Sequence, residues 1–451
     1  MNWARGNNAL RAVQAMPLPA SGLPPSKQAQ GPGSPAIVVP LAASPAPAKA
    51  PRLSSQASRQ SKLSLSLGAG KRLSNHLDAE SPASSRPDSS RQAQPPLRAL
   101  LDANGEKEDG AGFFGSIRFS SAPFPSKFVR LASKHDFTDP EESGLYARHV
   151  VDLALSTWKL PAPCAMISIP DAGSSTSKLS VNSRLDLVVR RGIAEAAYRT
   201  GAWIFTGGNA GDPAAHVAGR AMLHLANEHG DSNRLPVIGV LPWRACNSNQ
   251  TLAKLPNGFS CTYVSGKKIA DPATLSELAK HGMEVVELDT HHSHFLMVDG
   301  PVENAALLRG TVEKYISDND VSKDHIQTPK VVLCVGGGAS AFKHIRDQLD
   351  AEDESTGVAV PCLVLVDSGG AAEDIYNFFE HDVYPTADPT SGRDKAYVAQ
   401  AKEHLAEIKR LGLLTGQNSR SQLAFFRLSD DLDAKDDLAL EIQCVASSLI
   451  P

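Results

Sequence analysis

Glycines close three apolar runs in this chain: WIFTGGNAG (residues 203–211), VVLCVGGG (331–338) and CLVLVDSGG (362–370). A short, continuous run of β-branched and apolar residues indicates a strand that is buried on both faces, as in a parallel sheet. Glycines directly after the strand allow a ligand to approach the backbone, and the helix that follows presents its first N–H groups to anions. The three stretches therefore predict a binding site for a negatively charged group where strand ends align along one edge of a sheet.

Strands and helices alternate through most of the chain. Further strands are predicted at 164–170, 237–241, 284–288, 294–298 and 423–428. Helices with one apolar face separate them, for example at 182–200, and two runs at 113–119 and 126–132 predict a hairpin before them. The pattern predicts an α/β fold: a Rossmann-like, doubly wound, mostly parallel sheet with an N-terminal β-hairpin and a C-terminal α/β extension.

The first part of the chain differs in composition. Residues 1–77 contain no Asp or Glu and nine Lys or Arg, which gives them a charge of +9 and leaves −13 for residues 78–451. Because this part is also rich in Pro, Ser, Ala and Gln, we predict a disordered basic tail over 1–108 and one domain over 109–451. Three roles stay open for the tail: a solvated linker, which we favour, a transit peptide, or a phosphorylated segment near Ser54 and Ser74.

The six cysteines are scattered, without C-x-x-C spacing: Cys164, Cys246, Cys261, Cys334, Cys362 and Cys444. We therefore expect reduced thiols in a cytoplasmic protein, and neither a zinc site nor a disulfide framework. No apolar run approaches the roughly 18–20 residues needed to cross a bilayer. The sequence predicts no transmembrane segment in this chain, and we expect no nucleic-acid partner.

The first glycine turn, TGGNAGD, is the strongest candidate site. Gly207 and Gly208, after Thr206, lack a Cβ where an anion would sit, and Gly211 allows a tight entry into the next helix. Asp212 is expected to cap that helix. The alternative is a turn that needs its glycines for packing alone, since the pattern departs from the G-x-G-x-x-G fingerprint of dinucleotide sites.

The second and third turns offer further candidate ligands for the same anion. The triple glycine repeats the argument, and two such turns on one sheet edge are stronger than one. The third turn adds a carboxylate that could hold ribose hydroxyls or, alternatively, cap the following helix. The candidates in these two turns are Gly336, Gly337, Gly338, Asp367, Ser368 and Gly369.

Arg309 lies in a helix that is expected to begin near Glu303. Its guanidinium group could reach a diphosphate with two parallel hydrogen bonds. The alternative is an ordinary exposed arginine on a helix surface.

A histidine-rich segment, LDTHHSHFLMVDG (288–300), raises the question of a metal site. Its spacing does not match the helical H-x-x-x-H zinc motif, so structural hydrogen bonding by His291, His292 and His294 is favoured and no metal ligand is predicted. The chain also has no G-x-S-x-G elbow and no cysteine with activating neighbours. No catalytic residue is predicted.

Longer segments match one known pattern over the whole predicted domain. They include GFFGSIRF (112–119), TWKLPAPCAMIS (157–168), RRGIAEAAYRTGAWIFTGG (190–208), HSHFLMVDG (292–300), PKVVLCVGGGAS (329–340), VPCLVLVDSGGAAEDI (360–375) and LAFFRLSDDLD (423–433). Together they resemble the N-terminal SLOG (LSDAT) domain of the melastatin-type transient receptor potential (TRPM) cation channels.

The resemblance implies a Rossmann-like fold that assembles around a fourfold channel, with TRPM-like subunits as partners in a homo-oligomer. It also implies that ADP-ribose or a related nucleotide is the candidate ligand, with no cofactor required. The ligand cleft of the family corresponds here to Thr206, Gly207, Gly208, Arg309 and Gly336 to Gly338.

Two departures from the family pattern weaken the expected anion site. Where relatives have tryptophan-glycine followed by basic residues, this chain has Trp243 followed by Arg244 and Ala245. The diglycine end of the first strand is replaced by Pro170-Asp171-Ala172-Gly173.

The function predicted from these observations is non-catalytic: a nucleotide-sensing, regulatory domain, in the cytoplasm or at the cytosolic face of a membrane as part of a channel. One alternative is a structural subunit-assembly module without a ligand. Another is a SLOG-type nucleotide phosphoribohydrolase, which is disfavoured because no catalytic carboxylate stands between Ala339 and Phe342, directly after Gly338.

Overall fold

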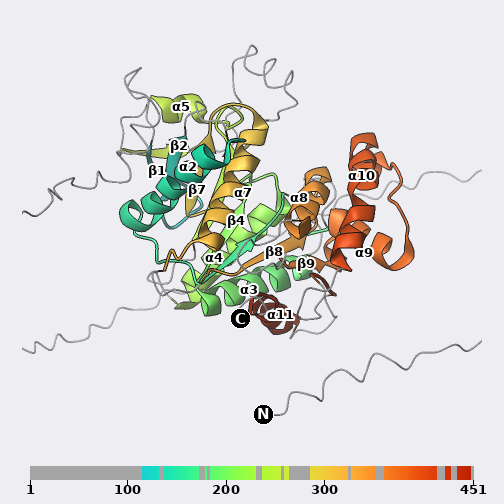
Figure 1. The fold of residues 1–451 in the computed structure, drawn as a ribbon. Helices are drawn as coiled ribbons and strands as arrows, with labels where there is room; N and C mark the ends of the chain where they lie inside the picture. Colours follow the sequence, from blue (N-terminus) through green and yellow to red (C-terminus); the bar gives the residue numbers. More distant parts are fainter. Residues whose placement is uncertain are drawn as a thin grey trace, which may run out of the picture. The chain divides into compact units, whose positions relative to one another are not determined.

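The computed structural model of the chain describes residues 114–131, 137–171, 178–179, 183–229, 236–254, 259–263, 285–322, 327–350, 360–413, 422–427 and 434–447 (Figure 1). All of them fall within one unit, Arg86–Pro451. The tail predicted over 1–108 lies outside the described residues.

The strands of the described residues are β1 (Phe114–Phe119), β2 (Ser126–Leu131), β3 (Ala165–Ser168), β4 (Ala202–Thr206), β5 (Val237–Pro242), β6 (Ser260–Tyr263), β7 (His294–Val298), β8 (Lys330–Val335), β9 (Cys362–Leu365) and β10 (Leu423–Phe426). They form one sheet in the order β10-β9-β8-β3-β4-β5-β7-β2-β1-β6. Neighbouring strands are parallel, apart from β1 and β2, which form the predicted antiparallel hairpin. The mostly parallel sheet confirms the predicted fold class.

The helices are α2 (Pro140–Asp152), α3 (Ser183–Thr200), α4 (Pro213–His229), α5 (Asn249–Ala253), α7 (Val302–Asp318), α8 (Ala339–Asp350), α9 (Gly370–His381), α10 (Lys395–Gly412) and α11 (Ala434–Ser447). Helices α3, α4 and α11 cover one face of the sheet, and α2, α7, α8, α9 and α10 cover the other (Figure 1). Side-chain alternation along β4 illustrates this: Ile204 packs with α3 and α4, whereas Trp203 and Phe205 pack with α2 and α7. The sheet is therefore doubly wound.

The order of the strands reverses beside β3. From β3 the chain builds outward to β4 and β5, and later returns to add β8, β9 and β10 on the other side of β3. Open α/β sheets bind ligands at such a reversal, outside the carboxyl ends of the strands. The three glycine turns follow β4, β8 and β9, which run parallel, and so they lie along this same edge.

Two residues mark helix boundaries in the structure. Gly201 follows α3 with a φ of +60°, the left-handed conformation that ends many helices. Asp212 precedes α4, and its Oδ1 accepts hydrogen bonds from the N–H groups of Ala214 and Ala215 at 2.9 and 3.3 Å. The Asp212 carboxylate thus satisfies a helix start that could otherwise have bound an external anion.

The strand expected at 284–288 is wrong. Among the described residues of this segment, Val286 forms an isolated parallel bridge with Cys246, and Leu288 forms an antiparallel one with Asn209. Two bridges of opposite direction do not make a ladder, so the segment instead joins the loops that follow β4 and β5. The edge strand β6 was not predicted, because its sequence SCTY is short and mostly polar.

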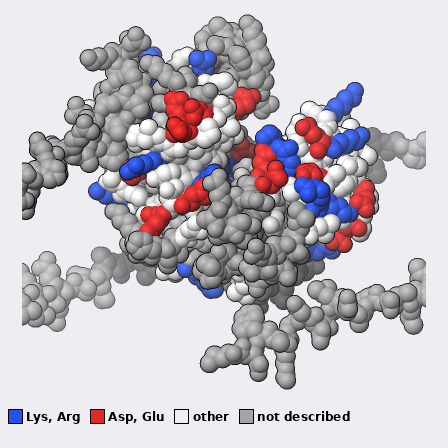
Figure 2. All heavy atoms as spheres, in the orientation of Figure 1, with Lys and Arg blue, Asp and Glu red and all other residues white. Residues whose placement is uncertain are grey.

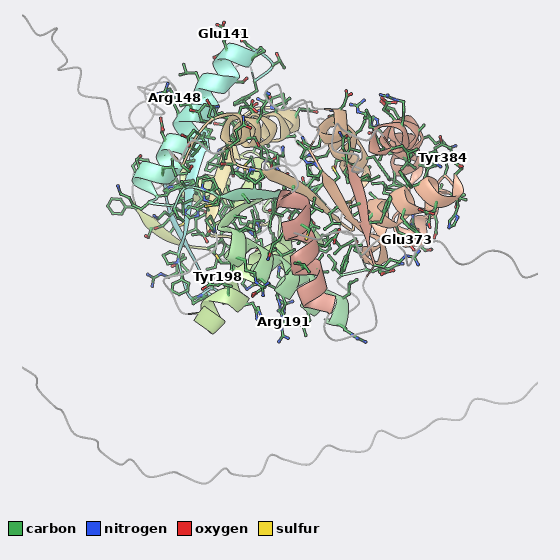
Figure 3. The ribbon with its side chains drawn as sticks, turned by 60° about the horizontal axis from the view of Figure 1, so that its bottom comes forward. Glu141, Arg148, Arg191, Tyr198, Glu373 and Tyr384 are labelled. Atoms are coloured by element: carbon green, nitrogen blue, oxygen red, sulfur yellow. The ribbon has the colours of Figure 1, made fainter. Side chains whose placement is uncertain are left out.

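Charged side chains of both signs are interspersed over α8 and α10 on the face shown in Figure 2. Some form pairs one helical turn apart, such as Lys343 with Asp347 at 2.5 Å. Glu141 and Arg148 on α2 project well away from Tyr384, which follows α9 (Figure 3). No helix among the described residues combines the length and the hydropathy that a membrane span requires.

Candidate functional site

Hydrogen bonds join the strand ends at the point where the strand order reverses. The N–H of Gly338, after β8, donates to the carbonyl of Asp171, after β3, at 3.1 Å. The N–H of Gly336 donates to Oγ of Ser368, after β9, at 2.7 Å. The structure therefore brings the second and third glycine turns together. We call the region around these ends of β3, β4, β8 and β9 the crevice, a name for its position at the reversal of the strand order.

Asp171 stands against the first glycine turn. The backbone of Gly207 favours the charged form of its carboxylate, and a Cβ on Gly207 would lie only 2.8 Å from its Cγ. Its Oδ1 is 3.8 Å from Nη1 of Arg309, and 56% of the side chain is exposed. Without a Cβ at position 207, a carboxylate thus reaches a backbone amide and a guanidinium group, as a bound anion would.

Arg309 is neither an exposed helical arginine nor a free fork for a diphosphate, the two alternatives considered from the sequence. It is buried, and its Nη2 donates to the carbonyls of Ile169 and Phe205 at 2.9 and 3.0 Å. The same atom donates to Oγ of Ser168, and Nε donates to Glu313 at 2.8 Å. Arg309 therefore ties α7 to the ends of β3 and β4, and Nη1 is the part that faces Asp171.

The second turn packs beneath α9. Gly336 and Gly337 have φ values of +70° and +98°. Their carbonyls accept hydrogen bonds from Ala372 and Ala371 at 2.7 and 2.9 Å, at the start of α9. A Cβ on Gly337 would lie 2.9 Å from the Cβ of Ala371. The triple glycine thus allows α9 to pack closely against the turn after β8, and this role does not depend on a ligand.

The remaining predicted residues differ in their positions. Asp367 is exposed, and Gly369, not Asp367, occupies the N-cap of α9, without a side-chain cap. Capping by Asp367 was therefore the wrong alternative. The N–H of Gly211 donates to Oδ1 of Asn209 at 2.9 Å, and a Cβ on Gly211 would meet no atom closer than 3.4 Å. Gly211 shapes its own loop, with no close approach that would require a glycine.

A buried hydrogen-bond chain holds the first turn in place. His292 lies between Asp289 and Thr206: Nδ1 is 3.0 Å from Asp289 Oδ1, and Nε2 is 2.7 Å from Thr206 Oγ1. Oγ1 of Thr206 also accepts from the N–H of Gly208 at 2.9 Å. The order resembles a catalytic triad, but all three side chains are buried, so the hydroxyl does not face a substrate. The structural role predicted for His292 is confirmed.

Known proteins match the part of this chain that contains the crevice. The family described as SLOG in TRPM matches residues 128–407. The chain belongs to this family. The transient receptor potential cation channel trpm of Drosophila melanogaster is 28% identical to it over 272 residues, which are 59% of this chain and 12% of the channel. The subfamily M member 4 channel of Rattus norvegicus is 28% identical over 279 residues, 60% of this chain and 20% of the channel.

A third relative, the subfamily M member-like 2 channel of Nematostella vectensis, is 27% identical over 283 residues, 61% of this chain. The SLOG chain spans between 12% and 20% of the length of these three relatives.

Trp243, the residue directly before the departure at Arg244, has a packing role in this SLOG domain. Trp243 is buried, and the guanidinium group of Arg130 lies 4.6 Å from the centre of its ring. Arg130 also pairs with Asp299 at 2.8 Å. The tryptophan thus anchors the loop after β5, and Arg244 beside it is exposed.

The sequence did not indicate Asp171 or Glu313 as parts of the crevice. The one signal was Asp171 itself, which departs from the diglycine end that the resemblance implies for the first strand. That residue was interpreted only as a loss of anion binding.

Proposed function

We propose that this SLOG domain is a non-catalytic regulatory module of a TRPM-type channel that binds a phosphate-bearing nucleotide, such as ADP-ribose, in the crevice. The position of the Asp171 carboxylate carries the proposal. Burial raises the pKa of Asp171, but Arg309 and the backbone of Gly207 oppose that effect and favour the charged carboxylate. These two groups are the ones that would attract an anionic ligand to this corner of the crevice. A phosphate oxygen has the same needs and would take the place of the carboxylate.

Competition between Asp171 and the ligand gives a direct test. Asp171→Asn removes the like charge and should tighten ADP-ribose binding by about tenfold, which corresponds to about 1.4 kcal/mol. Gly207→Ala places a Cβ in the same corner and should abolish binding. Isothermal titration calorimetry of the full chain with ADP-ribose, NAD and ATP at up to millimolar concentration measures both.

Gly144→Ala is the matched control, since a Cβ there would meet no atom within 4 Å. It should bind as the unchanged chain does. Absence of saturable heat for the unchanged chain and for Asp171→Asn, with every ligand, would refute nucleotide binding in the crevice.

The absence of catalysis is part of the proposal. The first turn of α8, from Ala339 to Phe342, carries no carboxylate, and the Thr206 hydroxyl is buried behind its own turn. A nucleotide bound in the crevice would therefore meet no general acid or base among these residues.

A second candidate, a ligand-free assembly module of channel subunits, is favoured by one specific observation. The N–H groups of Gly208, Gly336 and Gly338 already donate to atoms of the protein. If the crevice binds no ligand, the unchanged chain should give no saturable heat with any nucleotide, and Gly207→Ala should keep the oligomeric state of the unchanged chain. Multi-angle light scattering beside the calorimetry distinguishes the two functions.

A further inference from the structure

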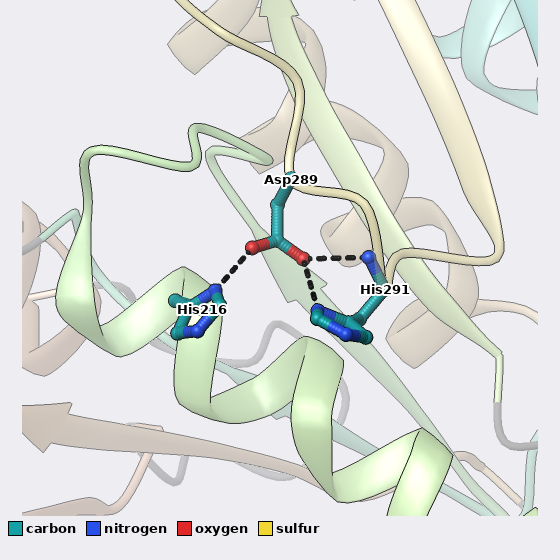
Figure 4. Close-up of side chains that lie close together, drawn as sticks. All are labelled: His216, Asp289 and His291. Atoms are coloured by element: carbon teal, nitrogen blue, oxygen red, sulfur yellow. Dashed lines mark hydrogen bonds and ion pairs between the residues drawn. The ribbon is translucent and has the colours of Figure 1, made fainter. Parts of the chain in front are cut away.

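Three side chains from two distant segments converge beside the first glycine turn (Figure 4). His216 comes from α4, and Asp289 and His291 come from the turn before β7. Nδ1 of His216 is 2.7 Å from Asp289 Oδ2, and Nδ1 of His291 is 3.8 Å from Asp289 Oδ1. One ligand atom from each of the three lies within 4.8 Å of the others. We call these residues the His–Asp–His cluster.

Gly219 on α4 lets the helix pack closely against the turn that carries Asp289 and His291, because it has no side chain. A Cβ on Gly219, one turn after His216 on α4, would lie 2.5 Å from Oδ1 of Asp289 and 3.0 Å from Cβ of His291. Only a glycine therefore lets α4 come this close to the turn at residues 289–292.

Hydrogen bonds to one of its oxygens fix the orientation of the Asp289 carboxylate. Oδ1 of Asp289 accepts hydrogen bonds from Nδ1 of His292 and from the N–H of His291, both at 3.0 Å. Its other oxygen, Oδ2, points to His216. Outer hydrogen bonds that fix one carboxylate oxygen and leave the other to a metal are typical of protein metal sites.

The cluster is accessible from one side. The side chain of His216 is 39% exposed and that of His291 14%, whereas Asp289 is 1% exposed. A small pocket lined by Phe124, Met222 and His291, among others, adjoins it. A metal ion would therefore enter past the exposed side chain of His216 and bind the buried carboxylate of Asp289.

We propose that the His–Asp–His cluster binds one divalent transition-metal ion, with Zn²⁺ as the best match. Two imidazoles and one carboxylate form a borderline donor set that suits Zn²⁺ rather than Ca²⁺ or Mg²⁺, and three protein ligands leave a fourth position for water. Ligand distances of about 2.0–2.2 Å require small movements of the two imidazoles. Binding replaces the hydrogen bond between His216 and Asp289. The inference does not depend on nucleotide binding.

The histidine-rich segment alone did not predict this site. Its own residues lack a metal-binding spacing, and the missing ligand, His216, lies 73 residues earlier in the sequence. Only the contact between α4 and the turn brings it into reach.

Zinc titration of the full chain, stripped with a chelator, tests the proposal. The single variants His216→Asn and His291→Asn spare Asp289 and its bond to His292, and each should weaken Zn²⁺ binding by at least about tenfold. The double variant should lose one bound Zn²⁺ per chain. The control His381→Asn, an exposed histidine at the end of α9, should bind like the unchanged chain.

Two further readouts separate loss of the metal site from loss of the fold. Far-ultraviolet circular dichroism should show unchanged folding in the metal-free variants. Co²⁺ should give the visible absorption of a four-coordinate site in the unchanged chain and lose it in the double variant. Equal Zn²⁺ affinity and stoichiometry in the unchanged chain and the double variant, or no Zn²⁺ binding by either, would overturn the proposal.

Discussion

Glu313 lies between two cations beneath the ends of β3 and β4. Its two oxygens are 2.8 Å from Nε of Arg309 and 2.8 Å from Nζ of Lys330, and all three side chains are buried. Burial alone would raise the pKa of Glu313, but Lys330 and Arg309 reverse that effect and lower it to about 2. Since Arg309 also holds the carbonyls of two strands, this ion group supports the floor of the crevice.

The substitution Glu313→Gln should destabilise the chain by about 3–5 kcal/mol at neutral pH, because it leaves two buried cations without their counter-ion. Urea unfolding measures the loss. Glu195→Gln, which breaks the exposed pair of Glu195 with Arg199, is the control and should leave the free energy of unfolding nearly unchanged.

The pH dependence follows from the direction of the shift. The pKa of Glu313 falls from 4.5 to about 2 on folding, so its contribution to stability is full above pH 4.5 and disappears as the pH falls toward 2. The difference between the unchanged chain and Glu313→Gln should shrink over this window. His344, whose pKa burial and Arg309 lower to about 3, adds a loss of stability below pH 6.5 in both chains. A difference that stays constant from pH 6 to pH 3 would contradict this assignment.

At the scale of elements, the turn after β8 fixes the approach of α9 to α8. Gly337 has a φ of +98°, and a Cβ there would lie 2.9 and 3.0 Å from the Cβ atoms of Ala371 and Ala341. These alanines belong to the two helices, so the turn acts as a spacer without a side chain between them.

Gly337→Ala should therefore destabilise the chain by about 1–3 kcal/mol, through strained backbone and overpacking together. Gly310→Ala, in the middle of α7 with no atom within 4 Å of the added Cβ, should instead stabilise it by about 0.5–1 kcal/mol. Thermal unfolding of the two variants should thus move in opposite directions. A shift of the same sign in both would contradict the packing argument.

The elements that the sequence predicted best are the buried ones. The apolar runs that begin at residues 203 and 331 start one residue inside β4 and β8. A continuous apolar run of this length is most stable at the centre of a sheet. β6 at the edge and the bridges around Val286 escaped prediction, because their pairing depends on which distant loop lies beside them. Side-chain direction was harder still. Nothing local indicates that Arg309 points under the strands, or that His216 faces Asp289.

Across the whole molecule, the six thiols fall into three groups by exposure, of which the half-buried group contains Cys261 alone. Cys246, Cys334 and Cys362 are buried, and burial raises the pKa of each thiol well above its ordinary value. Cys164 and Cys444 are exposed. The scattered spacing that indicated free thiols in the sequence thus corresponds to free cysteines in the structure.

Alkylation should follow this division. Iodoacetamide at neutral pH should modify Cys164 and Cys444 in the native chain within minutes, while the three buried thiols react only after denaturation, because the thiolate is the reactive form and needs access. Peptide mass spectrometry at successive times gives the order. Early labelling of Cys334, at the centre of the sheet, would indicate that the sheet opens readily.

Asp171 contacts two glycine turns. Its carboxylate faces the backbone of Gly207, after β4, and its carbonyl accepts a hydrogen bond from the N–H of Gly338, after β8. A ligand that displaced the Asp171 carboxylate would also move the Asp171 carbonyl. That movement would shift the turn after β8 and, with it, the first residues of α9. Ligand binding in the crevice would then change the position of α9 through a single residue, Asp171, and would require no lid.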